Sequence, residues 1–371
     1  MGMLNGINYP GVIGFRTLFV KVFGTFFAVA GGLCIGKEGP LAHIGANVGA
    51  ISAHIPITGF RCLRNDVIKR QLVAAGASAG VSAAFGSPIG GSLFSYESSK
   101  PNTFWTFSML WRVFFGSSIC TFMLSIFTAL YNGSPFSLTD AATLKFGELE
   151  SEENTLLDIP AAVFIGGVCG CLGALFIHVN VSLAILRKKY INTNAKRLAE
   201  AAFFAFMTST VFFMAVFLRR DNCKPTLDTE DKESQFRFYC PWGQYNPLGS
   251  LIFNTEGGTI RQLLDFPVVV RTVQESEDSP VSIANIIIYA CLWYGFTITT
   301  YGVWVPAGLF LPGILIGCSI GLIYTEILTN LFGLDIQRLG GQSYIICGAS
   351  AMLAGYTRLT YSLAVVMLET T

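Results

Sequence analysis

Residues 36–40 read Gly-Lys-Glu-Gly-Pro, and residues 308–312 read Gly-Leu-Phe-Leu-Pro. A shift of the chain by 272 residues superimposes the two motifs without a gap. The shift also places Gly45 and Gly49 on Gly317 and Gly321, Gly-Ala-Ser-Ala at 76–79 on the same letters at 348–351, and Glu97 on Glu369. Glycine and alanine are common in membrane helices and match by chance, but two separate blocks with one offset favour an internal repeat.

The composition excludes most soluble classes of protein. Of 371 residues, 52% are hydrophobic and 13% are charged, about half the ~25% charged share of soluble proteins. A mean hydropathy of +0.55 and 31 phenylalanines argue against disorder. With 24 basic and 23 acidic residues, the net charge of +1 leaves no basic footprint for nucleic acid. The chain is therefore predicted to be a polytopic membrane protein.

Nine apolar stretches approach the ~20 residues that a helix needs to cross a bilayer. They lie near 14–35, 40–60, 71–98, 103–131, 158–186, 198–218, 284–305, 309–333 and 343–368. Glycine and proline interrupt several of them, at 36–40, 86–91 and 306–312. Such breaks survive in a membrane only inside protein or beside water. The prediction is an all-α membrane protein with broken and re-entrant helices.

Basic residues predict the orientation in the membrane. One cluster is Arg61, Arg64, Lys69 and Arg70, and the other is Arg187, Lys188, Lys189, Lys196 and Arg197. Both clusters are expected on the cytosolic side. The acidic stretch at 148–153 and the polar stretch at 220–283 then face the lumen or the extracellular space.

The polar stretch contains two of the ten cysteines, Cys223 and Cys240. In an oxidising lumen these two thiols form a disulfide, and otherwise they stay free. The other eight cysteines lie in or beside apolar stretches, where a small soft side chain packs well.

Pro40 and Pro312 each suit the first turn of a helix, where no amide hydrogen is missed. Each motif therefore predicts a helix that begins inside the membrane. Paired broken helices in two related halves are typical of a transport site at the bilayer midplane. The unpaired N–H groups at two such helix starts, with about half a positive charge each, form an anion site without a full positive charge.

Glu38 lies at the first of these helix starts, where an ionised carboxylate is costly unless it has a partner. The functional hypothesis is that the carboxylate occupies the positive helix end in place of the anion and leaves when it is protonated or outcompeted. The alternative is a fixed ion pair with Lys37 or a charge that only stabilises the helix, although adjacent residues do not share a helix face.

These motifs, with Gly-Ser-Pro-Ile-Gly-Gly at 86–91 followed by Leu-Phe-Ser-Tyr-Glu at 93–97, resemble the CLC family of chloride channels and proton-coupled chloride exchangers. Tyr-Cys-Pro at 239–241 and Phe-Asn-Thr at 253–255 further resemble its endosomal and lysosomal branch. The resemblance implies an inverted-repeat fold and a homodimer with one pore per subunit, in an intracellular membrane rather than the plasma membrane. It implies that Glu38 gates chloride.

The resemblance also implies the residues of the anion site, in which backbone amides near Gly39 and at Leu309 and Phe310 help to hold chloride. The site residues taken together are Gly36, Lys37, Gly39, Pro40, Gly308, Leu309 and Phe310. No metal-ligand spacing is present, and we expect no cofactor.

The expected organisation is one transmembrane core over 1–371, with the first-half motifs at 36–99 and the second-half motifs at 308–371. The resemblance implies further parts outside these residues: a Gly-Ser-Gly-Ile-Pro motif before the first helix, a last pore helix with a tyrosine, and cytosolic CBS domains. The sequence is accordingly interpreted as a fragment or a shortened form.

Exchangers of the family carry a second glutamate at the position of Ser98, and a serine does not hold a proton there. Ser98 therefore favours a passive chloride channel gated by Glu38, unless the neighbouring Glu97 donates the proton. A chloride/proton antiporter is the alternative, favoured by the lysosomal-branch resemblance. For Glu97 itself, a charge at a helix end is the simpler interpretation than a proton relay.

Two other classes of function are alternatives to transport: a serine hydrolase and a structural subunit. Gly-Ala-Ser-Ala-Gly at 76–80 fits a serine-hydrolase pattern, but the copy of Ser78 at Ser350 favours helix packing over catalysis. A non-conducting structural subunit is the other alternative. The costly buried acid Glu38 argues against it.

Overall fold

The computed structural model describes residues 11–54, 65–99, 105–133, 156, 158–226, 235–273, 282–332 and 341–370. In chain order the helices of this part are α1 (Phe15–Ala30), α2 (Glu38–Ser52), α3 (Asp66–Phe85), α4 (Pro88–Ser99), α5 (Phe107–Tyr131), α6 (Asp158–Tyr190), α7 (Asn194–Leu218), α8 (Pro247–Phe253), α9 (Glu256–Val273), α10 (Ile283–Thr300), α11 (Phe310–Phe332), α12 (Gly341–Thr357) and α13 (Tyr361–Thr370). A two-stranded antiparallel ribbon joins β1 (Lys224–Pro225) to β2 (Gln244–Tyr245). The predicted all-α class is confirmed.

Five helices in the described ranges are long and apolar enough to cross a membrane: α5, α6, α7, α10 and α11. Others are much shorter, with 15 residues in α2, 12 in α4 and 10 in α13. At 1.5 Å per residue these three helices do not cross a ~30 Å hydrocarbon core. The protein is a multi-pass membrane protein with broken helices. Nine near-spanning segments were predicted, which is more than the five helices of the described residues that are long and apolar enough to cross.

Two of the predicted segments are in fact pairs of helices. Gly86 ends α3 in the left-handed conformation (φ 68°), and its N–H donates to Ser82 at 2.7 Å. Arg358 ends α12 with φ 58°, and its N–H donates to Ala354 at 2.8 Å. The first break was predicted from its glycines. The prediction of one apolar segment over 343–368 was wrong, because the chain breaks at Arg358, and an arginine gives no sign of a left-handed turn in the sequence.

The polar stretch 220–283 contains helices that the sequence pattern did not predict. Asn246 begins α8 as its N-cap, since its side chain accepts the N–H of Gly249 at 3.0 Å. α9 follows at Glu256 and packs against α11 and α12. The stretch 220–283 contains many polar residues, so its hydropathy pattern does not indicate either helix.

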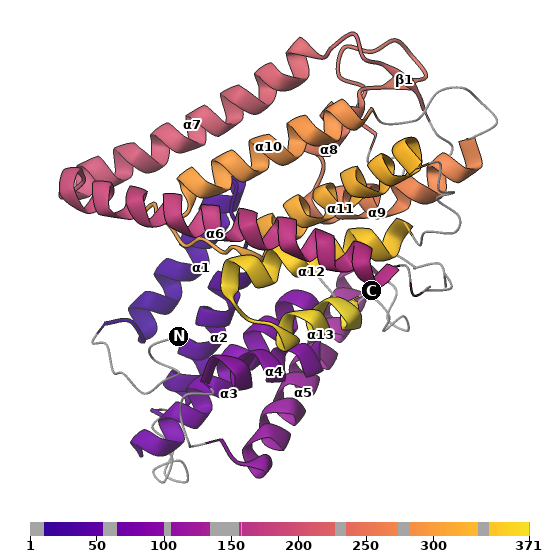
Figure 1. Ribbon diagram of the computed structural model, residues 1–371. Coiled ribbons are helices and arrows are strands. Elements are labelled where there is room, and N and C mark those ends of the chain that lie inside the picture. Colours follow the sequence, from indigo (N-terminus) through magenta and orange to yellow (C-terminus); the bar gives the residue numbers. More distant parts are fainter. Residues whose placement is uncertain are drawn as a thin grey trace.

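The two halves repeat the same close packing of helices. A Cβ added to Gly45 of α2 would meet the carbonyl oxygen of Gly76 of α3, and a Cβ added to Gly76 would meet the carbonyl oxygen of Gly45. In the second half, a Cβ on Gly317 of α11 would lie 2.5 Å from the carbonyl oxygen of Gly348 of α12. Figure 1 shows the first-half helices α2 to α5 below and the second-half helices α10 to α12 above, with α13 beside α4 where the halves meet. The predicted inverted-repeat fold is confirmed in this arrangement.

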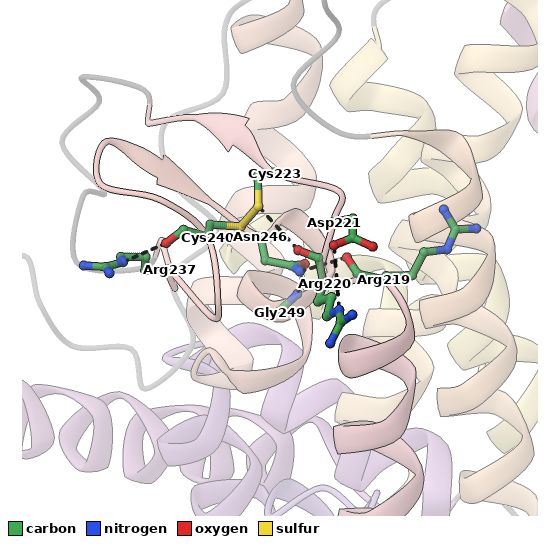
Figure 2. The surroundings of a disulfide bond; sticks show 8 residues. All are labelled: Arg219, Arg220, Asp221, Cys223, Arg237, Cys240, Asn246 and Gly249. Atoms are coloured by element: carbon green, nitrogen blue, oxygen red, sulfur yellow. Dashed lines mark hydrogen bonds and ion pairs between the residues drawn. A yellow bond between two sulfur atoms is a disulfide. The ribbon is translucent and has the colours of Figure 1, made fainter.

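The long helices α6 and α7 follow α5 in the sequence and form a hairpin, in which α7 lies along the upper edge of the view and α6 crosses its middle against α12 (Figure 1). After α7, Cys223 and Cys240 are joined by a disulfide, with their Cα atoms 5.8 Å apart. Figure 2 shows this bond beside Asn246, whose side-chain amide donates to the Arg219 carbonyl at 3.1 Å. The disulfide and the hydrogen bond together connect the end of α7 to the start of α8.

Some predictions fall outside the described residues. These are the cytosolic placement of Arg61 and Arg64 and the acidic stretch at 148–153.

The glycine contacts predict which substitutions destabilise the protein. Gly317→Ala places a Cβ against the backbone of α12 and should lower the free energy of unfolding by about 1–3 kcal/mol. Gly170→Ala is the matched control, because a Cβ at Gly170 of α6 has no atom within 4 Å. Alanine there should leave stability unchanged or raise it by up to about 1 kcal/mol. Thermal unfolding in detergent measures both, and equal midpoints for the two variants would contradict the packing.

Candidate anion-binding site

The centre of the site is a pair of backbone hydrogen bonds between the two halves. The N–H of Gly36 donates to the carbonyl of Gly308 at 2.8 Å, and the N–H of Gly308 donates to the carbonyl of Gly36 at 2.9 Å. This antiparallel bridge joins the two glycines that the 272-residue shift superimposes. The local two-fold axis of the repeat therefore passes between them.

The bridge brings the starts of α2 and α11 together. A Cβ on Gly308 would lie 2.9 Å from the nitrogen of Gly39 and 3.1 Å from Cδ of Pro40, and one on Gly39 would lie 3.0 Å from Cα of Gly308. Only glycine allows this approach. Two helix N-termini with their unpaired N–H groups thus meet inside the protein, as the motifs predict.

Glu38 belongs to α2, but its carboxylate points toward the other half. A Cβ on Gly36 would touch Oε2 of Glu38 and lie 3.2 Å from the backbone nitrogen of Leu311. Glu38 is 0% exposed, and in the described part of the chain its carboxylate oxygens accept no hydrogen bond of full geometry, while the backbone N–H groups of Glu38 and Leu311 favour its ionised form. The carboxylate therefore lies at the positive start of α11, the place where an anion would bind.

Two charged side chains act on Glu38 through space. Lys37, which precedes it, is half-buried and attracts the carboxylate. Glu256, in the first turn of α9, repels Glu38 and is itself attracted by Lys37. Glu256 was not predicted, because it lies in the polar stretch 220–283, whose sequence indicates a connection rather than part of a site.

An aromatic wall supports the start of α11. The ring of Phe310 is buried and packs edge to face on Phe85 at 5.8 Å and on Phe94 at 5.9 Å, measured between ring centroids. Leu309 beside it is half-buried. Phe85 and Phe94 were not predicted, and only their nearness to the break at 86–91 could have indicated them.

The model of the family described as "Voltage gated chloride channel" matches residues 1–371. The chain belongs to this voltage-gated chloride channel family. It is 35% identical over 377 residues to the H(+)/Cl(-) exchange transporter 7 of Mus musculus. This alignment covers 99% of this chain and 45% of the transporter. It is 31% identical to the chloride channel protein C of Dictyostelium discoideum, over 100% of this chain and 49% of the relative. The chain spans about half the length of these curated relatives.

Solved structures of the family have the same fold. A slow cyanobacterial Cl-/H+ antiporter superimposes with a TM-score of 0.66 at 19% identity, over 100% of this chain and 70% of the antiporter. A eukaryotic CLC transporter gives a TM-score of 0.64 at 22% identity, over 97% of this chain and 51% of the transporter.

Within this family fold, Glu97 lies at a helix start rather than free in a pore. Its Oε1 accepts the N–H of Thr360 at 2.9 Å, and its Oε2 accepts the N–H and the hydroxyl of Ser362 at 3.1 and 2.5 Å. Glu97 of α4 thus caps the start of α13. All four hydrogen bonds of Glu97, including one from the Thr360 hydroxyl, come from Thr360 and Ser362 at the start of α13.

An equivalent cap is formed by the second half on the first. Glu369 of α13 accepts the N–H of Gly90 at 2.9 Å and that of Ile89 at 3.2 Å, and it also accepts the hydroxyl of Ser87. Glu369 therefore caps the start of α4. The two helices exchange caps through the residues that the 272-residue shift relates.

The other sequence candidates are buried hydroxyls. Ser98 is 5% exposed, and its hydroxyl has no partner among the described residues. Ser78, the candidate nucleophile, shares a hydrogen bond of 2.7 Å with the Ser117 hydroxyl of α5. That contact supports helix packing for Ser78.

The exchanged caps predict equal losses of stability in the two halves. Glu97→Gln and Glu369→Gln each weaken hydrogen bonds to a charged acceptor and should each lower the free energy of unfolding by about 1.5–3 kcal/mol. Asp221→Asn is the matched control, because the Asp221 side chain is 94% exposed. Thermal unfolding in detergent measures the three variants. Loss of proton transport in Glu97→Gln without a change in the unfolding midpoint would instead make Glu97 a proton relay.

Proposed function

We propose that the protein carries chloride across a membrane in exchange for protons, and that Glu38 both gates the anion and carries the proton. The observation that carries this proposal is the Glu38 carboxylate, which is fully buried at the start of α11 and accepts no side-chain hydrogen bond in the described part of the chain. A purely structural acid would have its oxygens satisfied, as Glu97 and Glu369 do.

The physical reason is competition for one positive helix end. An ionised Glu38 is attracted by the positive start of α11 and excludes an anion of the same charge. A protonated Glu38 loses that attraction and leaves the helix start to chloride. Because the site is made of helix ends, it holds the anion weakly enough for transport. The backbone of Gly39, Leu309 and Phe310 would supply the donors.

The named relatives support exchange over passive conduction. The H(+)/Cl(-) exchange transporter 7 of Mus musculus and of Homo sapiens are each 35% identical to this chain over 99% of its length. Ser98 alone favours a passive channel, but these relatives favour exchange, which is therefore the first proposal.

A passive chloride channel is the second candidate function, favoured by Ser98. Its hydroxyl lies where the family resemblance expects a second proton-carrying glutamate, and a hydroxyl does not titrate in the working pH range. The neighbouring Glu97 holds four hydrogen bonds from α13, so its carboxylate is committed to the helix start.

We also propose an endosomal or lysosomal membrane and a homodimer, which follow from the family resemblance. The disulfide between Cys223 and Cys240 supports a lumenal or extracellular position for the segment between α7 and α8, because disulfides persist in oxidising compartments.

The test is simultaneous recording of chloride and proton movement in liposomes that contain the purified protein. An outward chloride gradient should drive proton uptake. In Glu38→Ala and Glu38→Gln, proton movement should fall to the level of protein-free liposomes while chloride flux continues, because neither side chain carries a proton or blocks the helix start by charge. Asp221→Asn is the control and should behave as the wild type.

The other outcomes separate the alternatives. Chloride flux without protons in the wild type would establish the channel. Absence of any flux in a monodisperse, folded preparation would favour the structural subunit. Proton coupling that survives Glu38→Gln would remove Glu38 from the proton path.

A further inference from the structure

The segment 301–309 connects α10 to α11 and ends at the anion site. It carries Gly308, which pairs with Gly36, and it leads into Phe310 at the helix start. The segment, called the second linker here, is not helical, so contacts with other elements must fix its path. These contacts determine where the donors of α11 lie.

The beginning of the second linker is held by α6. The side-chain amide of Asn180 donates to the carbonyl of Ile298 at 3.1 Å and to that of Tyr301 at 2.7 Å. These carbonyls belong to the last turn of α10 and the residue after it, where carbonyl groups lack partners within the helix.

Arg187, two turns further along α6, binds the same region with two donors and α7 with a third. Its Nη1 donates to the carbonyl of Tyr301 at 3.0 Å, and its Nη2 donates to the carbonyl of Thr299. Its Nε donates to Oε1 of Glu200 in α7 at 2.6 Å. The side chains of Arg187 and Glu200 are only 10% and 8% exposed. Glu200 therefore neutralises and orients a guanidinium whose other donors hold α10.

A glycine makes room for this contact. Gly302 has φ of 98°, and a Cβ there would lie 3.0 Å from Nη1 of Arg187. The chain therefore turns sharply under the guanidinium immediately after Tyr301, with a residue that alone adopts this conformation without strain.

The contacts continue along the second linker to the site. The guanidinium of Arg197 in α7 stacks 3.6 Å from the ring centroid of Trp304. Pro306 packs on α1, since its Cγ would lie 3.0 Å from a Cβ on Gly24. Gly308 then pairs with Gly36. The path from Arg187 to the anion site is thus continuous.

The clamp made by Arg187 and Glu200 holds the turn after α10, and the 272-residue shift relates this turn to the turn after α1. In the first half, the chain after α1 turns with backbone bonds, from the N–H of Gly31 to Phe27 at 2.9 Å and from that of Gly32 to Val29 at 3.0 Å.

We propose that Arg187, oriented by Glu200, is a positioning residue that sets the anion affinity and selectivity of the site by fixing the second linker. Arg187 itself does not touch the anion. This inference rests on the proposed anion transport. Lysine does not replace it, because one ammonium group does not reproduce the planar three-way fork.

The experiment compares Arg187→Lys, Arg187→Gln and Asn180→Ser with the wild type in liposomes. Two quantities are measured: the chloride concentration at half-maximal flux and the ratio of chloride to nitrate flux. Arg187→Lys should raise the half-maximal concentration about three- to tenfold, the effect of a weakened helix-end interaction, and should change the ratio. Asn180→Ser should change both in the same direction but less. Lys188→Gln, at an exposed neighbour, and Arg220→Gln should match the wild type.

The readouts separate positioning from simple stabilisation. A merely structural arginine would lower the yield and the maximal flux but leave the half-maximal concentration and the ratio unchanged. If every folded variant among the three keeps the wild-type values, the inference is overturned, and Asn180→Ser provides this test even where Arg187→Gln does not fold. Absence of anion flux in the wild type would overturn the proposed function, and the inference with it.

Discussion

Two backbone hydrogen bonds between Gly36 and Gly308 are the contact on which the proposed anion site depends. They hold the linkers of both halves side by side, so that α2 and α11 begin at the same place. A side chain at either position would separate them, because a Cβ on Gly308 has its neighbours at 2.7 to 3.1 Å. Without this contact the two positive helix ends would lie apart, and Glu38 of one helix would not reach the start of the other.

The repeat extends beyond this centre to the ends of helices. Gly86 and Arg358 occupy equivalent positions, and both end their helices in the left-handed conformation. Glu97 and Glu369 then cap each other's helices across the boundary between the halves. Each half therefore supplies charges that complete the other, which explains why α4 and α13 are stable although each is too short to cross the membrane. Among the described residues, Glu38 differs from these two acids, because neither of its oxygens accepts a side-chain hydrogen bond.

The hairpin of α6 and α7 holds both ends of the segment that it contacts. Arg187 and Asn180 bind the end of α10, and the disulfide between Cys223 and Cys240 fixes the other end of α7 to the start of α8. Side chains thus support the second linker, whereas backbone hydrogen bonds form the related turn after α1.

The sequence by itself determined the two related halves, the helix starts at the two proline motifs, and Glu38 as the acid between them. Glycine, proline and a charge inside an apolar stretch act on their own neighbourhood, so their effect is visible in the linear order. The left-handed turn at Arg358 was equally present in the repeat, as the counterpart of Gly86, but residue type alone concealed it. Only the tertiary structure decided that Gly36 pairs with Gly308, that Glu97 and Glu369 exchange caps, and that Arg187 holds the second linker. Each of these is a contact between residues more than a hundred positions apart, and side-chain chemistry states what a group can bind but not which distant group the fold brings to it.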